Sequence, residues 1–311
     1  MSEKQISNWL SQNLSYSLHK RLKKKFPTNP TIAANIDDQW QGDLLFLKEL
    51  SKYNSNYYII LVFIDVISRY AWVELMKNKT GPVATRAFEN ILKRASPRKP
   101  KKIQTDKGSE FLNRDFQNLL KKREIDYFNT FSDQKASIAE RFIQTLKNYI
   151  YRYIDENSTN RYYDKIQDIV NTYNSTVHSS TQFAPNEVNE SNLNQVLHNL
   201  YGKLWQSDAL TSRKIHYKVG DHVRISTAHH SDIFRKGYRG KWSEELFKIH
   251  SIKDTYPNVT YGIVDLKNNP IMGSFYEAEL QKVSAPDFDK DYWRIEKIIR
   301  HKKVRGKKCI W

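Results

Sequence analysis

Short runs of β-branched and aromatic residues, separated by polar turns, dominate the apolar pattern from residue 40 onward. Three of them follow one another: WQGDLLFL (40–47), YYIILVFIDV (57–66) and YAWVELM (70–76). Runs of this length and composition are typical of β-strands, and the short polar breaks favour strands that turn back on one another. We therefore predict a three-stranded antiparallel meander.

Helical spacing follows the meander. TGPVATRAFENILKRAS supplies Thr80 as an N-cap and Pro82 in the first turn, which are helix start signals. Beyond it, strand and helix patterns alternate: a strand at 102–105, a helix at 113–123, a strand at 125–128 and a long helix from about Ile138.

The long helix carries apolar residues on one side. They recur every four residues, so one side is expected to pack and another to stay exposed: Phe142, Leu146, Ile150 and Ile154. Strands followed by strand–helix units predict an α/β fold, with a mixed sheet flanked by helices.

The remaining segments differ in texture. Residues 1–34 are polar and basic, which predicts an N-terminal arm, and residues 191–213 read as a linker after a proline-marked turn. Residues 214–285 contain short strand-like pieces separated by Gly, Asn and Asp turns. This pattern is typical of a small all-β barrel.

Composition excludes several classes of protein. The single cysteine, Cys309, allows no intramolecular disulfide and no cysteine-based zinc site, and it indicates a reducing compartment. No apolar run reaches the roughly 18–20 residues that a membrane span needs, and the N-terminus lacks the apolar core of a signal peptide. We expect an intracellular protein with no membrane partner.

The net charge of +17 points to a polyanionic partner. Basic residues gather at 19–26, 97–102 and 300–308. Any one cluster could be an ordinary solvated face, but three of them together favour nucleic acid.

Three carboxylates are candidates for a catalytic role because of where they lie in the predicted strands and helices. Asp43 lies inside an apolar strand, Asp106 follows a short strand, and Glu140 opens the long helix. Alone, each could be a cap, a turn residue or half of an ion pair. Together they could converge on two divalent cations, which activate a water or a 3′-hydroxyl and stabilise the leaving oxygen in phosphodiester chemistry. Mg²⁺ prefers such oxygen ligands.

The motifs around these residues resemble a known family. DDQWQGDLLFL, FIDVISRYAWVEL, IQTDKGSEF and SIAERFIQTLKNYI, with YNSTVHSSTQFAPNEV later, are similar to the integrase catalytic core of retroviruses, retrotransposons and, most closely, Maverick/Polinton transposons. The resemblance covers about residues 35–190. It implies a ribonuclease H-like fold in which Asp43, Asp106 and Glu140 bind two Mg²⁺ or Mn²⁺ ions and perform catalysis.

The resemblance has departures and further implications. The spacing between Asp106 and Glu140 is slightly shorter than the retroviral one, and Lys107 stands where Asn is most common. Asp65 matches a recurring position that is not a metal ligand, so we expect it to play a strand-end role. Residues expected to contact DNA flank the site or lie in the second basic cluster: Lys107, Gln144, Lys147, Lys101 and Lys102.

The C-terminal part resembles two further modules. Residues 214–285 are similar to the SH3-like barrel of related integrases, and their aromatics are expected in its core: Trp242, Phe247, Tyr261 and Phe275. Residues 287–311 resemble the start of a chromodomain, with Trp293 matching one aromatic of its methyl-lysine cage. Because the sequence ends before the other cage residues, we do not expect histone binding by this segment alone.

The leading hypothesis is a transposon-encoded integrase. It would process DNA 3′ ends and transfer them into target DNA in the nucleus, as a homo-oligomer. Two alternatives remain open: a catalytically retired protein that binds DNA or chromatin, and a nuclease of the same fold.

Overall fold

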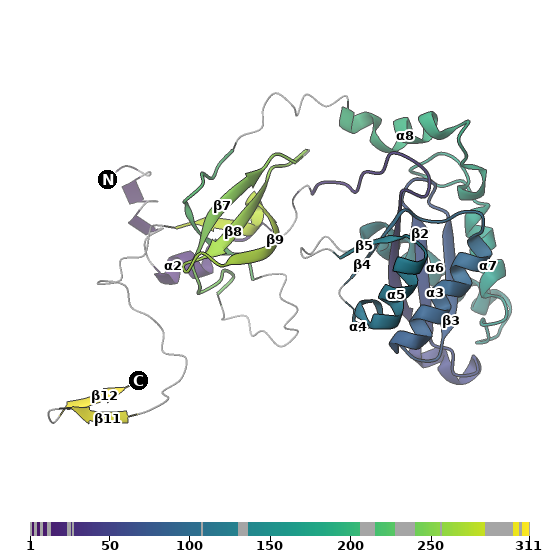
Figure 1. Cartoon of the computed structure of the whole chain (residues 1–311), viewed down its shortest axis with the longest axis horizontal. Coiled ribbons are helices and arrows are strands. Elements are labelled where there is room, and N and C mark those ends of the chain that lie inside the picture. Colours follow the sequence, from purple (N-terminus) through teal and green to yellow (C-terminus); the bar gives the residue numbers. More distant parts are fainter. Residues whose placement is uncertain are drawn as a thin grey trace.

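The computed structural model describes residues 14–23, 26, 28–106, 108–129, 136–205, 215–227, 240–255, 257–283, 301–304 and 307–310, with isolated positions (2, 5, 6, 9, 10) before them. Figure 1 shows two bodies of regular structure, a helix-flanked sheet and a smaller sheet. None of the helices in these ranges is both long and apolar enough to cross a membrane.

The larger sheet has five strands in the order β3-β2-β1-β4-β5. β1, β2 and β3 pair antiparallel, which confirms the predicted meander, and β4 and β5 run parallel to β1. The sheet is therefore mixed, as predicted. The strand bounds are β1 (Gln39–Phe46), β2 (Ile59–Asp65), β3 (Ala71–Met76), β4 (Lys102–Thr105) and β5 (Asp126–Asn129).

Helices cover both faces of this sheet (Figure 1). One face packs against α3 (Gly81–Ala95) and α5 (Arg114–Lys122), with the short α4 (Ser109–Leu112) beside them. The other packs against α6 (Ser137–Glu156) and α7 (Ile166–Asn174). Each helix buries an apolar stripe, and burying one such large side chain contributes roughly 1.5–3 kcal/mol.

The segment expected to be a linker contains helix α8 (Leu193–Trp205). Its Val196 and Tyr201 are buried in a small cluster with Val66 and Ile67, which follow β2. This apolar face anchors the helix to the larger sheet and its helices. The segment predicted as a linker thus includes a helix that packs against the larger body.

The smaller body is an antiparallel sheet in the order β10-β6-β7-β8-β9. Three of the expected aromatics belong to its core: Phe247 and Tyr261 are buried there, and the half-buried Phe275 packs against them. Trp242 is buried outside this cluster, with its Nε1 donating to the carbonyl of Lys20 at 3.1 Å. The bounds are β6 (His222–Ile225), β7 (Phe247–Lys253), β8 (Thr260–Asp265), β9 (Pro270–Tyr276) and β10 (Leu280–Lys282). The remaining elements are α2 (Leu14–His19), β11 (His301–Val304), β12 (Lys307–Ile310) and the 3-10 helices Lys48–Tyr53, Pro185–Glu187 and Glu277–Glu279.

The expected N-terminal arm contacts both bodies: Leu18 and Asn29 bond to the region of the smaller sheet, whereas Thr31 and Ala33 contact Gln41 and Tyr201 of the larger one. The backbone N–H of Lys241 donates to the carbonyl of Leu18 at 2.7 Å. The Asn29 side chain pairs in both directions with the backbone of Asn258, at 2.7 and 2.8 Å. Residues 18–29 are thus tied to a region more than 200 positions away, a pairing that local sequence patterns do not contain.

The C-terminal segment that resembles a chromodomain is described only in part. β11 and β12 form an antiparallel hairpin within the segment that resembles a chromodomain. Trp293 lies outside the described residues.

Candidate active site

Asp43 and Asp106 occupy equivalent positions on adjacent parallel strands. Gln41 of β1 is paired with Gln104 of β4 in the register of the sheet, and each aspartate follows its glutamine by two residues. Because side chains alternate between the faces of a strand, residues two apart project to the same face. Asp43 is half-buried and Asp106, directly after β4, is exposed.

Gln41 identifies which face this is. Its side-chain amide donates to Gln104 Oε1 at 3.1 Å, while its own Oε1 accepts the backbone N–H groups of Ile138 and Ala139 at 2.9 and 3.2 Å. Those N–H groups lie in the first turn of α6, where they have no partner within the helix. The fully buried Gln41 side chain therefore joins β1, β4 and the start of α6.

Glu140 follows Ala139 on α6 and is half-buried. Its backbone N–H donates to the carbonyl of Ala136 at 2.9 Å, while its carboxylate has no hydrogen-bond or ion-pair partner among the described residues. Its position in the first turn is electrostatically favourable for a carboxylate, because the helix N-terminus carries partial positive charge. The fold thus brings the three predicted carboxylates to one end of the sheet, on the side that α6 covers.

The donor set fits a hard divalent cation. All three groups are carboxylates, and two of them accept a neighbouring backbone N–H: Asp43 Oδ1 accepts that of Leu44 at 2.7 Å, and Asp106 Oδ1 accepts that of Gly108 at 3.1 Å. Within the described residues, however, no three Asp, Glu, His or Cys side chains stand close enough together to form a metal site. The register of β1 and β4 and the contacts of Gln41 bring the three elements together.

Asp65 is a structural residue, as expected from the sequence. Its fully buried carboxylate accepts the backbone N–H and the hydroxyl of Ser68 at 2.7 and 2.6 Å and lies 3.4 Å from Arg98 Nη2. Burial raises the pKa of Asp65, while Arg98 and Ser68 act in the opposite direction. The two hydrogen bonds from Ser68 close the turn after β2, so Asp65 stabilises this turn.

The expected DNA-contacting residues are placed as follows. Gln144 is exposed and Lys147 half-buried, four and seven residues after Glu140 on α6, which puts them on the same side of the helix. Lys147 Nζ lies 5.6 Å from the centre of the Tyr151 ring. The two lysines of the second basic cluster lie at the start of β4. Lys101 pairs with Asp38 at 2.7 Å, and Lys102 is the first residue of that strand. Lys107 lies outside the described residues.

Gly42 leaves room for the ring that supports this strand. A Cβ added there would lie 2.5 Å from Phe63 Cε1, closer than carbon atoms can approach. We expect Gly42→Ala to lower the free energy of unfolding by about 1–3 kcal/mol through overpacking, and to displace Asp43. Chemical denaturation measures this, and an unchanged midpoint would show that Phe63 can move aside at no cost.

Comparisons with known proteins identify the family of this chain. A model of the integrase core domain matches residues 35–130, which contain Asp43 and Asp106. The chain is 30% identical over 205 residues to an uncharacterized transposon-derived protein of Caenorhabditis elegans, covering 66% of this chain and 67% of that protein. The chain belongs to the integrase core domain family.

More distant similarities extend this assignment. A retrovirus-related Pol polyprotein from a transposon of Nicotiana tabacum is 28% identical over 130 residues, which are 41% of this chain and 10% of that protein. A chain in the cryo-EM structure of the simian T-cell lymphotropic virus intasome aligns with a TM-score of 0.64 and 14% identity, over 92% of this chain and 93% of that chain. At this identity the likeness concerns the fold, a ribonuclease H-like integrase core followed by a small β domain.

Proposed function

We propose that this protein is a transposon-derived integrase that processes DNA 3′ ends and joins them to target DNA. The observation that carries the proposal is the placement of Asp43, Asp106 and Glu140 on three elements that Gln41 holds together. Membership of the integrase core domain family supports the same reaction class.

The three carboxylates would hold two Mg²⁺ or Mn²⁺ ions. When bound, such ions activate the attacking oxygen and stabilise the leaving oxygen of an in-line phosphodiester displacement. The chain itself would position these ligands. The pairing of β1 with β4 fixes Asp43 and Asp106 relative to each other, and the first turn of α6 fixes the position of Glu140. Because Asp43 and Glu140 are half-buried, they are partly shielded from water and interact more strongly with a cation than fully exposed groups would.

Basic side chains would bind the DNA backbone. Lys147 and Gln144 share the Glu140 side of α6, and the overall charge of +17 draws a polyanion to the protein. These contacts are sequence-independent, so the choice of DNA ends must come from other interactions.

We expect Lys147→Gln to weaken binding of unrelated DNA sequences alike. The slope of log affinity against log salt should become shallower by about 0.9, the effect of one lost phosphate contact. Lys121→Gln is the matched control, because Lys121 is exposed on α5, which packs on the opposite face of the sheet. Fluorescence anisotropy at several salt concentrations measures both slopes, and equal slopes for the two variants would place Lys147 off the DNA path.

The proposal extends to the class of parent element, the small β domain, the oligomeric state and the location of the protein. The motifs that resemble Maverick/Polinton integrases suggest that class of parent element, and the antiparallel sheet of residues 222–282 is compatible with an SH3-like barrel. Insertion of two DNA ends calls for at least a dimer, and a DNA substrate of this kind places the protein in the nucleus. Chromatin binding is a weaker extension, resting on the segment that contains β11 and β12.

Two other functions fit the same fold. A retired DNA-binding protein would bind DNA without reacting, and the absence of a converged metal cluster among the described residues is the observation that favours it. A nuclease of this fold would cleave without joining.

One assay separates the three functions. Purified protein is incubated with labelled element ends and a supercoiled target, with Mg²⁺, with Mn²⁺ and with a chelator. Metal-dependent joined product is the result expected of an integrase. Cleavage without joining would identify a nuclease, and binding without either would identify the retired protein.

A further inference from the structure

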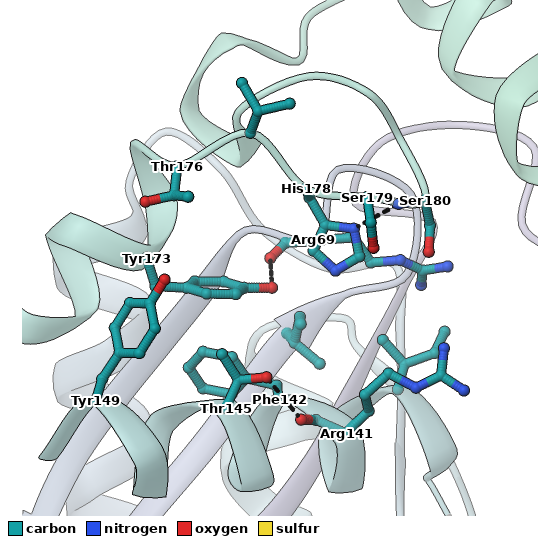
Figure 2. Close-up of a pocket in the computed structure, with 13 residues that line it drawn as sticks. Arg69, Arg141, Phe142, Thr145, Tyr149, Tyr173, Thr176, His178, Ser179 and Ser180 are labelled. Atoms are coloured by element: carbon teal, nitrogen blue, oxygen red, sulfur yellow. Dashed lines mark hydrogen bonds between the residues drawn. The ribbon is translucent and has the colours of Figure 1, made fainter. Parts of the chain in front are cut away.

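A cavity of about 300 Å³ lies between α6 and the loop that follows α7 (Figure 2). Its floor is formed by Phe142, Thr145 and Arg141 of α6, and its upper rim by residues 176–180. Arg69, in the turn between β2 and β3, enters from the side. The cavity therefore joins three segments that are far apart in sequence.

Two guanidinium groups gather on one side of this cavity. Figure 2 shows Arg69 beside His178 and Arg141 below them, while Tyr149 and Tyr173 line the opposite side. Within the described residues, neither arginine pairs with a carboxylate. Arg69 is half-buried and Arg141 is exposed at the cavity edge, and their like charges repel each other although Asp65 partly offsets the charge of Arg69. An anion between the two guanidinium groups relieves that repulsion.

The arginine from the β2–β3 turn is held in place by the backbone. Arg69 has a left-handed conformation with a φ of 63°, its Nη1 donates to the carbonyl of Val66 at 2.6 Å, and its own carbonyl accepts the Tyr173 hydroxyl at 3.1 Å. A non-glycine residue in this conformation is strained and persists where its surroundings fix it. The guanidinium is thus preorganised in the cavity wall.

The imidazole of His178 completes the donor set. Its Nδ1 accepts the backbone N–H of Ser180 at 3.1 Å, so the neutral ring carries its proton on Nε2 and can donate from there. Burial lowers the pKa of His178 to about 4, and the nearby Arg69 and Arg141 act in the same direction. The hydroxyl groups of Ser179 and Ser180 border the same side of the cavity.

We infer that this cavity binds a phosphate group, and that on DNA it holds a backbone phosphodiester next to the reacting one. Two guanidiniums with hydroxyl and imidazole donors match the several oxygens of a tetrahedral anion, for which arginine is the preferred partner. Arg141 directly follows Glu140, and Ile138 of the cavity precedes it by two residues, so the cavity and the proposed catalytic site share one turn of α6. Only the DNA part of this inference rests on the proposed function.

The test uses the full chain without divalent cations, so that no reaction is followed. The imidazole resonances of His178 are recorded by NMR while a short single-stranded oligonucleotide or inorganic phosphate is added. We expect both probes to shift these resonances and to raise the pKa of His178, because the anion offsets the positive charges of Arg69 and Arg141. Unmoved resonances under conditions where the oligonucleotide is bound would overturn the inference.

Variants on α6 give an independent measurement. Arg141→Gln should weaken oligonucleotide binding about tenfold, the usual effect of losing one hydrogen bond to a charged group. Arg152→Gln removes the same charge from an exposed position on the same side of α6, eleven residues on and outside the cavity, and should change the affinity by less than about twofold because salt screens a charge that makes no contact. Equal effects of the two substitutions would show that Arg141 acts only through its net charge, and would contradict a specific anion-binding site.

The two proposals can fail separately. A response to phosphate but not to the oligonucleotide would support an anion cavity and overturn its assignment to DNA. Binding of the oligonucleotide at His178 by a chain that joins no DNA would sustain the cavity and contradict the integrase reaction. DNA joining by a chain whose His178 resonances do not respond to the oligonucleotide would support the integrase reaction and contradict phosphate binding in the cavity.

Discussion

Replacing Glu140 by glutamine is expected to reduce DNA joining by about a thousandfold, because loss of one carboxylate weakens metal-ion stabilisation that is worth several kcal/mol in the transition state. Glutamine preserves the size of the side chain and the helix, but it removes the negative charge that attracts the ions. Since the Glu140 carboxylate makes no hydrogen bond or ion pair within the described residues, and the substitution keeps the backbone bond to Ala136, folding should stay intact. The joining assay with matched amounts of folded protein measures the loss.

The control for this prediction lies on the same helix. Glu156→Gln removes a carboxylate from the exposed end of α6, about 24 Å from Glu140 at 1.5 Å per residue, and joining should remain unchanged. If both variants join DNA as well as the native chain does, Glu140 is not a metal ligand and the proposed catalytic residues are wrong.

Replacing Gln41 by leucine is expected to lower the free energy of unfolding by about 2–4 kcal/mol, because two helix N–H groups lose their acceptor in a buried place. The backbone amides of Ile138 and Ala139 both bond to Gln41 Oε1, and Ala139 is fully buried. Leucine has nearly the same volume but no acceptor. Chemical denaturation measures the stability, and joining should fall as well, because α6 then loses its link to β1.

Gln167→Leu is the matched control. Gln167 of α7 is exposed and makes one side-chain hydrogen bond, to the carbonyl of Val73 at 3.2 Å, so its loss should change stability by less than about 1 kcal/mol. Equal effects of the two substitutions would mean that water replaces Gln41 at the start of α6, and Gln41 would not join the elements of the site.

The sequence predicts the larger five-stranded sheet well because its elements are locally encoded. The three apolar runs became β1, β2 and β3, and the four-residue spacing of Phe142, Leu146 and Ile150 became the buried side of α6. In each case the period of the apolar residues matches the repeat of the element that formed.

Long-range packing was not accessible in this way. Residues 191–213 were predicted to be a linker, yet Val196 and Tyr201 are buried against residues after β2. Likewise Leu18 and Asn29 bond to the small sheet more than 200 residues later. Such contacts depend on which surfaces meet in the folded chain, and no local period records them.

The candidate site was predicted in part. The resemblance assigned roles to Asp43, Asp106 and Glu140, and the fold places them at one end of the sheet, but their function as ligands stays a prediction. Gln41 was missed. A polar residue two positions before Asp43 in an apolar strand was the available signal, and its role became visible only when its side chain was seen to meet both Gln104 and α6.

Manganese binding by the native chain tests the central claim most directly, since it requires no knowledge of the DNA ends. Mn²⁺ broadens NMR signals of nearby nuclei, so the backbone signals of Leu44, Gly108 and Ala139 should broaden first, and Asp106→Asn should abolish the effect at the same Mn²⁺ concentration. Broadening of this group, lost in the variant, is the predicted result. Broadening centred elsewhere, or unchanged in the variant, would contradict a metal site built from Asp43, Asp106 and Glu140.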